Sequence, residues 1–130
     1  MTRDEIITAL EMATGPSMGL SREVARFVGW VNRGNSRNGE WFHPSDTRHG
    51  KPVLDSLRGT DVYRDPPNFT GSLDAALTLV GNHWWEVRGR GPYYACVGHE
   101  DGTGRSLSDG QATPPLALCI AALRAREPKP

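Results

Sequence analysis

Cysteine and net charge are both scarce in this sequence. The only two cysteines, Cys96 and Cys119, sit in apolar patterns, which predicts buried free thiols and no disulfide. The formal net charge is zero, which argues against a protein that binds nucleic acid through bulk electrostatics and against a polybasic membrane anchor. Because no signal peptide and no apolar run of membrane-spanning length is present, we expect a cytosolic protein.

Recognisable catalytic motifs are also missing. No serine lies in a nucleophile-elbow motif, and neither a dinucleotide fingerprint nor a P-loop occurs. His83 and His99 flank a predicted hairpin and could act as acid–base groups, but lone histidines at strand ends are more often polar surface residues. We therefore assign no catalytic residue and no cofactor, and we favour a non-enzymatic protein.

The bulk composition indicates one domain. A chain of 130 residues can bury a substantial core, and 37% hydrophobic residues together with the glycines approach the globular average. The 15 glycines and 10 prolines indicate long loops on an ordered frame. We expect a single domain over residues 1–130, with a long irregular loop at about 32–71.

Two amphipathic helices are predicted before that loop. Thr2-Arg-Asp-Glu5 forms a capping box, and apolar residues at helical spacing follow it as far as Gly15-Pro16. Ser21 is the expected N-cap of a second, short helix. Its predicted buried face consists of Val24, Phe27, Val28 and Val31.

The segment 32–71 is rich in turn-forming residues and has no period. A structureless loop of this length is uncommon in a compact domain, so it is either mobile or functional. In the second case its own aromatics would hold it: Trp41, Phe42, Tyr63 and Phe69. His43, Asp46 and His49 have the residue types of a metal site, but no helix fixes their spacing and no cysteine supports them. We assign no metal there.

The stretch 72–88 is the part around which we expect the chain to be organised. Ser72 caps a helix that Gly81-Asn82 ends, since both residues tolerate the left-handed conformation. Its predicted apolar face is Leu73, Ala76, Leu77 and Val80. From His83 onward the period changes to two. This alternation turns Trp85 and Val87 toward the helices, and it turns the remaining side chains away from them: Trp84, Glu86 and Arg88.

The remaining elements complete a small sheet and a closing helix. A turn at Gly89–Pro92 leads into a second strand, Pro92–Val97, and Arg105–Leu107 predicts a short third strand. Thr113 and Pro114 begin the last helix. Its predicted buried face is Leu116, Cys119, Ile120 and Leu123. The pattern predicts an α/β protein of the α+β kind, in which helices pack on a small antiparallel sheet. The thin sheet, with an unpaired edge and outward aromatics, also predicts a homo-oligomer.

Three stretches resemble the phage ABA sandwich domain family. They are Leu10–Ser17, Leu73–Val80 with the following Trp85-x-Val87, and Ala112–Arg126. The resemblance covers the chain outside the segment 32–69 and the tail. It implies an alpha-beta-alpha sandwich in a small phage or prophage protein, and it implies no reaction.

A binding surface is predicted on the hairpin and the long loop. An outward tryptophan on a small sheet is either covered by the loop or used for contact. Arg88 and Arg90 either cradle a phosphate or are solvated arginines of an ordinary turn. The predicted binding residues are Trp84, Arg88, Arg90 and Tyr94 from the hairpin and Trp41, His43 and Tyr63 from the loop.

The expected function is that of a phage- or prophage-encoded binding protein in the bacterial host cytoplasm. We expect it to counter a host defence, either by sequestering a nucleotide-like signal or by occupying a host defence protein. The phage setting comes from the resemblance. We expect neither a membrane nor a nucleic acid as a partner. A small hydrolase or nucleotide-modifying enzyme that uses loop histidines, and a phage assembly accessory protein, are the alternatives.

Overall fold

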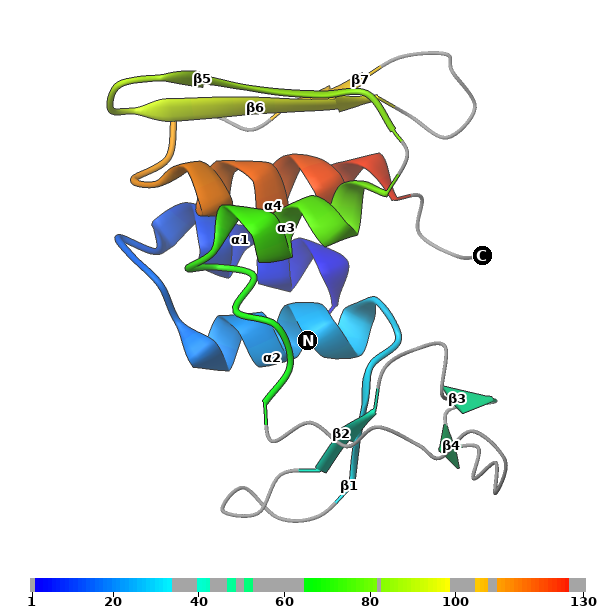
Figure 1. Ribbon diagram of the computed structural model, residues 1–130. Helices are drawn as coiled ribbons and strands as arrows, with labels where there is room; N and C mark the ends of the chain where they lie inside the picture. Colours follow the sequence, from blue (N-terminus) through cyan, green and yellow to red (C-terminus); the bar gives the residue numbers. More distant parts are fainter. Residues whose placement is uncertain are drawn as a thin grey trace.

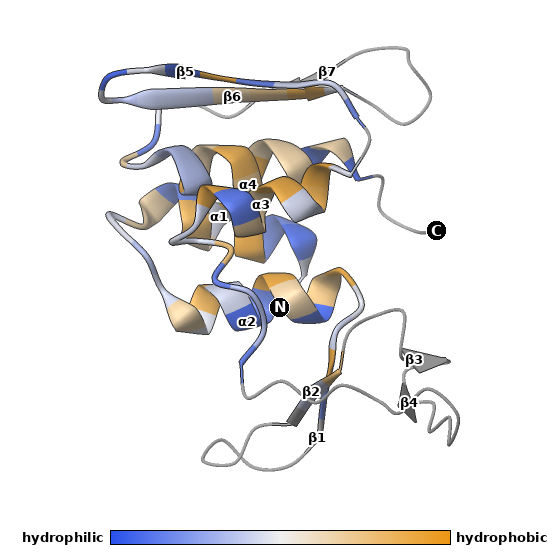
Figure 2. Cartoon of the chain, viewed as in Figure 1, coloured by the Kyte–Doolittle hydropathy of each residue, from blue (hydrophilic) through white to orange (hydrophobic). Residues whose placement is uncertain are grey.

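The C-terminal helix α4, Pro114–Ala125, is the central element of the fold. In the computed structural model it lies between a three-stranded sheet and the helices α1 and α3 (Figure 1). Every residue from Leu116 to Leu123 is at most 1% exposed, and hydrophobic residues run along the helix (Figure 2). A helix that is apolar all round belongs inside a protein core. The expectation of one buried stripe was therefore too narrow, and α4, in place of the stretch 72–88, organises the chain.

The structure describes the residues 2–33, 40–42, 47–48, 51–52, 65–81, 83–98, 105–107 and 110–126. Within these ranges the three-stranded sheet has the order β5-β6-β7 and is antiparallel throughout. Its strands are β5 (Trp85–Gly89), β6 (Tyr93–Gly98) and β7 (Arg105–Leu107). Gly89 and Gly91 have φ angles of 118° and 116°, in the region that favours glycine. The predicted hairpin, third strand and α+β class are confirmed, with β6 beginning one residue later than expected.

Three further helices begin at side-chain caps. Helix α1, Arg3–Met12, has the predicted capping box of Thr2 and Glu5, and α3, Leu73–Val80, begins at the predicted cap Ser72. Helix α2, Met18–Phe27, begins earlier than expected, because Ser17 and not Ser21 accepts the hydrogen bond of the first turn. None of the described helices has both the length and the apolar character that crossing a membrane requires.

The layers follow one another in a single direction from the sheet (Figure 1). Helix α4 lies directly against the sheet, α1 and α3 contact α4, and α2 contacts α1 on the side away from the sheet. Beyond α2 lies a second antiparallel pair, β1 (Val31–Arg33) and β2 (Glu40–Phe42), followed by β3 (Thr47–Arg48) and β4 (Lys51–Pro52). The described helices therefore all lie on one side of the three-stranded sheet.

The described parts of the segment 32–71, which we expected to be a long irregular loop, include short strands. Val31 pairs with Phe42, and β3 pairs with β4, so short hairpins interrupt it. Strands of two or three residues are too short to produce a recognisable alternation. Trp41, Phe42 and Phe69 are 1%, 4% and 1% exposed, so aromatics do hold the described part of the segment, as predicted. Tyr63 and the predicted metal-type residues His43, Asp46 and His49 lie outside the described residues.

The buried faces of α2 and α3 differ from the predicted ones. On α3 the core residues are Ala76, Leu79 and Val80, whereas Leu73 is 37% exposed and Leu77 is only half-buried. On α2 the core residues are Ser21, Val24 and Ala25, while Phe27 and Val28 are half-buried and Val31 belongs to β1. The period of the apolar residues predicts that a helix has a buried face. It does not predict which residues that face includes, because contacts with the neighbouring elements set the rotation of the helix about its axis.

A buried polar cluster joins α2 to the segment before α3. The hydroxyl of Thr70 accepts the Ser17 N–H at 2.8 Å and donates to the Ser17 carbonyl at 2.9 Å. The Ser21 hydroxyl lies 2.9 Å from this oxygen and accepts the Thr70 N–H at 3.1 Å. Ser21 and Thr70 are both fully buried, and their mutual bonds satisfy these polar groups without water. Ser21 is therefore a tertiary anchor and not a helix cap.

We expect Leu79→Ala to lower the free energy of unfolding by about 2–5 kcal/mol, because it leaves a cavity between α3 and the core. Leu73→Ala in the same helix is the matched control and should cost less than about 1 kcal/mol, because Leu73 is partly solvated. Urea unfolding followed by circular dichroism measures both values. Equal losses would show that the buried face of α3 is oriented differently.

Thr70→Val should lower the free energy of unfolding by about 1–3 kcal/mol, because it leaves the Ser17 N–H and its neighbours without partners in a buried site. Thr78→Val makes the same chemical change at an exposed position, where the hydroxyl donates only to the Ala75 carbonyl. The control should change stability by no more than about 0.5 kcal/mol. If the two variants are equally stable in urea, the cluster does not contribute to folding.

Candidate binding surface on the three-stranded sheet

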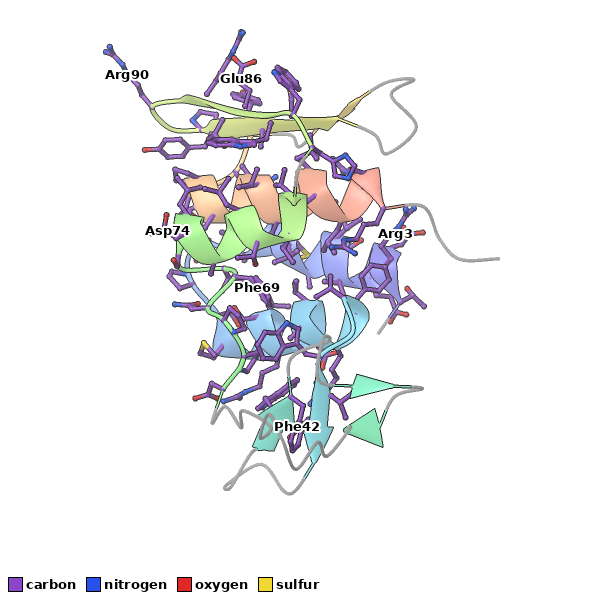
Figure 3. The ribbon with its side chains drawn as sticks, turned by 45° about the vertical axis from the view of Figure 1, so that its right-hand side comes forward. Arg3, Phe42, Phe69, Asp74, Glu86 and Arg90 are labelled. Atoms are coloured by element: carbon purple, nitrogen blue, oxygen red, sulfur yellow. The ribbon has the colours of Figure 1, made fainter. Side chains whose placement is uncertain are left out.

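One side of the three-stranded sheet faces away from the helices, and we call it the outer face. Its residues on β5 and β6 follow from the register, since directly paired residues of antiparallel strands share a face. Ala95 and Val97 of β6 are 1% exposed and point toward α4, so the alternating positions point outward. These positions, with Trp84 just before β5, are Trp84, Glu86, Arg88, Tyr94 and Cys96. Figure 3 shows Glu86 on this side of the sheet.

Two large aromatic side chains are exposed on the outer face. Trp84 is 54% exposed and Tyr94 is 48% exposed. The prediction that Trp84 points away from the helices is confirmed. Trp85 was expected to be covered, and it lies on the same side as its buried partner Val97, yet it is 42% exposed. Within the described ranges β5 forms the edge of the sheet, and only β6 lies beside it, which leaves Trp85 open on its other side.

The outer face carries one carboxylate and one arginine in direct contact. The Nε of Arg88 donates to Oε1 of Glu86, two residues away on the same strand. This hydrogen bond raises the pKa of Arg88 above its ordinary value. Arg90 lies exposed in the turn after β5, and its side chain points away from the protein (Figure 3). The two guanidinium groups give this end of the hairpin an excess of positive charge over Glu86.

A glycine positions the ring of Tyr94. A Cβ atom at Gly110 would lie 2.7 Å from Cβ of Pro92 and 3.3 Å from the Tyr94 hydroxyl. Gly110 immediately precedes Gln111, which exchanges two backbone hydrogen bonds with Tyr93 at 2.9 and 2.8 Å. The absence of a side chain therefore lets the Tyr94 hydroxyl lie close to the backbone of residue 110. Sequence reasoning missed Gly110, because only the paired backbone brings it to the hairpin.

The structure brings four of the predicted binding residues to one end of the molecule. Trp84, Arg88 and Tyr94 lie on the outer face, and Arg90 lies in the adjoining turn. Trp41, expected to form the opposite wall, is buried at the other end in β2, where the Arg26 guanidinium lies 5.2 Å from its ring centroid. It lies beyond α2, several layers from the sheet (Figure 1). The predicted loop residues His43 and Tyr63 lie outside the described residues.

A separate small pocket lies at the C-terminal ends of α3 and α4. Its volume is about 210 Å³, and its lining includes Val80, His83, Val97 and Arg126. Arg126 donates to the Leu79 carbonyl at 3.3 Å, and Arg3 donates to the Arg126 carbonyl at 2.5 Å. Arginines near helix C-termini stabilise the negative ends of the helix dipoles, which explains these contacts structurally. The pocket is smaller than the ~300–1,000 Å³ typical of ligand sites, so the outer face is the stronger candidate.

The cysteines differ in their surroundings. Cys119 lies in the core of α4, and its thiol donates to the Phe69 carbonyl at 3.1 Å. Burial raises the pKa of the Cys119 thiol to about 12. Cys96 is half-buried on the outer face, which corrects the prediction that both thiols are buried; both are free. Among the described residues, no three His, Cys, Asp or Glu side chains converge in a way that could hold a metal ion.

Comparison of the chain with protein-family models, with curated proteins and with solved structures found no match. The resemblance to the phage ABA sandwich family therefore stays a prediction.

We expect iodoacetamide at pH 8 to modify Cys96 in the folded protein and to leave Cys119 unmodified. A thiol whose pKa is about 12 stays protonated at this pH, and the thiolate is the reactive form. Peptide mass spectrometry after timed quenching measures both sites. In urea both cysteines should react, which is the control for reagent access. Equal rates of modification in the folded protein would contradict the burial of Cys119.

Proposed function

We propose that this protein is a non-enzymatic binding protein and that the outer face of its three-stranded sheet is the binding surface. The observation that supports this most is the exposure of Trp84 and Tyr94 on a face that no described helix covers. Tryptophan, tyrosine and arginine are the residues most enriched at the centres of binding interfaces. Large exposed aromatic side chains on one face of a small protein are typical of a contact site.

The residue types on this face suit a ligand with a planar ring and an anionic group. Trp84 offers a ring for stacking, and Arg88 and Arg90 offer forked donors to phosphate or carboxylate. Trp84, just before β5, and Arg88 on β5 are four residues apart, which corresponds to ~13 Å at the rise of a β-strand. Glu86 lies between them and holds the Arg88 guanidinium. A bound phosphate would have to replace this carboxylate, so Arg90 is the more accessible first contact.

A nucleotide-like molecule combines these two chemical features, and a host protein could present them as an aromatic and an acidic side chain. We propose that the protein sequesters such a signal, or occupies such a host protein, in the cytoplasm of a bacterial host and so counters a host defence. The phage or prophage setting of this proposal is supported by the resemblance alone. The chemistry of the ligand is supported by the outer face.

The other two functions that the sequence left open receive less support. A hydrolase that uses loop histidines would depend on His43 and His49, which lie outside the described residues. His83 is half-buried at the α3–α4 pocket and is the one histidine whose surroundings are described. No described feature favours a role in phage assembly. The test below separates all three functions.

We expect Trp84→Ala and Arg88→Ala to weaken binding at least tenfold while leaving the thermal midpoint nearly unchanged, because both side chains are exposed. Isothermal titration with a panel of nucleoside mono-, di- and triphosphates measures the affinity, after native mass spectrometry of the purified protein identifies any retained ligand. Arg22→Ala is the matched control. It removes an exposed arginine of α2, paired with Asp65, in a layer distant from the sheet.

Four outcomes would contradict the proposal. Unfolding of the Trp84→Ala variant would show that Trp84 belongs to the core. Release of phosphate or base from a nucleotide would indicate an enzyme, and stoichiometric incorporation into virions would indicate an assembly protein. Weakening by Arg22→Ala as strong as that by Arg88→Ala would show that charge, and not the outer face, governs binding.

A further inference from the structure

The free edge of strand β5 is a second surface, which adjoins the proposed binding surface and shares Arg88 with it. In the part of the chain that the structure describes, no strand lies beyond β5, which ends the order β5-β6-β7. The strand is five residues long, and Trp85 on it is 42% exposed. An edge strand presents unpaired backbone groups and is a template for pairing with another chain.

The hydrogen bonds within the sheet show which residues of β5 point to this edge. The Gly98 N–H donates to the Trp84 carbonyl at 2.8 Å, so Trp84 directs its backbone groups toward β6. Backbone direction alternates along a strand, which gives Glu86 and Arg88 the same direction. Tyr93 fits this pattern. It is the register partner of Gly89, and its backbone N–H and C=O bond to Gln111 on the side away from β5. The residues that direct their N–H and C=O groups to the open edge are therefore Trp85, Val87 and Gly89.

We propose that β5 pairs with β5 of a second copy of this chain, antiparallel, about a two-fold axis at Val87. The edge is complementary to itself in this register. Val87 lies opposite Val87 of the second copy and exchanges both hydrogen bonds with it. Glu86 lies opposite Arg88 of the second copy, and the two-fold axis repeats this pair. A symmetric pairing of identical edges closes after two copies, so that it produces a dimer and no filament.

Electrostatics favours this register over the two registers in which the two-fold axis is shifted by one residue. In an antiparallel pair, side chains stay on matching faces only if the two-fold axis passes through a residue. An axis at Glu86 would place this carboxylate opposite its own copy, and an axis at Arg88 would place the guanidinium opposite its own copy. Like charges directly opposite each other destabilise a sheet. The axis at Val87 instead joins the two existing Glu86–Arg88 pairs into four charges of alternating sign.

The geometry of the pairing brings these charges close together. Glu86 and Arg88 of the second copy form a non-hydrogen-bonded pair, in which the Cα atoms are only ~4.5 Å apart. Trp85 lies opposite Gly89 of the second copy, where the missing side chain leaves room for the indole ring. Position 89 requires glycine for a separate reason. Its φ is 118°, and a Cβ atom there would lie 2.3 Å from the Pro92 carbonyl oxygen.

Charge reversal tests this dimer. We expect light scattering at high micromolar concentration to give twice the 14.2 kDa mass of the chain for the unmodified protein. Glu86→Arg and Arg88→Glu should each raise the dimer dissociation constant at least tenfold, because each places like charges opposite each other. An equimolar mixture of the two variants should return to a dimer that contains one of each.

Arg22→Glu makes the same change on α2 and should leave the mass unchanged. A monomer of the unmodified protein, or a mixture that stays monomeric while both variants fold, overturns the proposal.

Cross-linking tests the register. We expect chains carrying Glu86→Cys and chains carrying Arg88→Cys, both with Cys96→Ser to remove the neighbouring thiol, to form a disulfide when mixed and oxidised. Neither variant alone should form one, because each cysteine then lies opposite a residue without a thiol. The Cα separation of such a pair is within the range that a disulfide spans. Cross-linking of either variant with itself, or none in the mixture, overturns the pairing at Val87. Both experiments run without a ligand, so their outcome is independent of the proposed binding function.

Discussion

Helix α4 is buried on all sides, and the positions of the other elements follow from this burial. A helix with apolar residues around its whole circumference needs neighbours in every direction, and the three other described helices supply them only in part. The three-stranded sheet covers one side of α4, while α1 and α3 cover the others. Cys119 of α4 is fully buried, and this burial raises the pKa of its thiol to about 12. Helix α4 contacts α1, α3 and all three strands of the sheet, so its position determines which of these elements lie next to one another.

Several polar groups at the periphery of this core form hydrogen bonds between distant segments. Thr70 and Ser21 bond to each other and to the backbone, which joins the segment before α3 to α2. Arg126 donates to the end of α3, and Arg3 donates to the end of α4. Such contacts place a donor where a helix leaves its last carbonyls without partners, and they align helices that periodicity alone would leave free to rotate.

The two surfaces that we propose for binding and for pairing are a consequence of the same arrangement. Because the described helices lie on one side of the sheet, only one face of the sheet is used by the core (Figure 1). The other face presents Trp84 and Tyr94 to solvent, and no described strand pairs with the outer edge of β5 beside Trp85. Exposed aromatic rings and a self-complementary edge are both unfavourable in an isolated chain. This is why we assign the face to a ligand or partner and the edge to a second copy.

Features whose signals are local could be predicted from the amino-acid sequence. The capping box of Thr2 and Glu5, the cap at Ser72, the turn at Gly89–Pro92 and the outward orientation of Trp84 each depend on a few neighbouring residues and were predictable. Other features depend on contacts with segments distant in the chain, and they became known from the fold. Ser21 anchors α2 to Thr70, and Leu79 in place of Leu73 is buried on α3. Trp41 lies several layers from Trp84. A periodic pattern specifies that a face exists, whereas its rotation and its partner are set by packing against segments distant in the chain. Gly110 lies beside the Tyr94 hydroxyl only because Gln111 pairs with Tyr93, so the amino-acid sequence carries no local signal for its role.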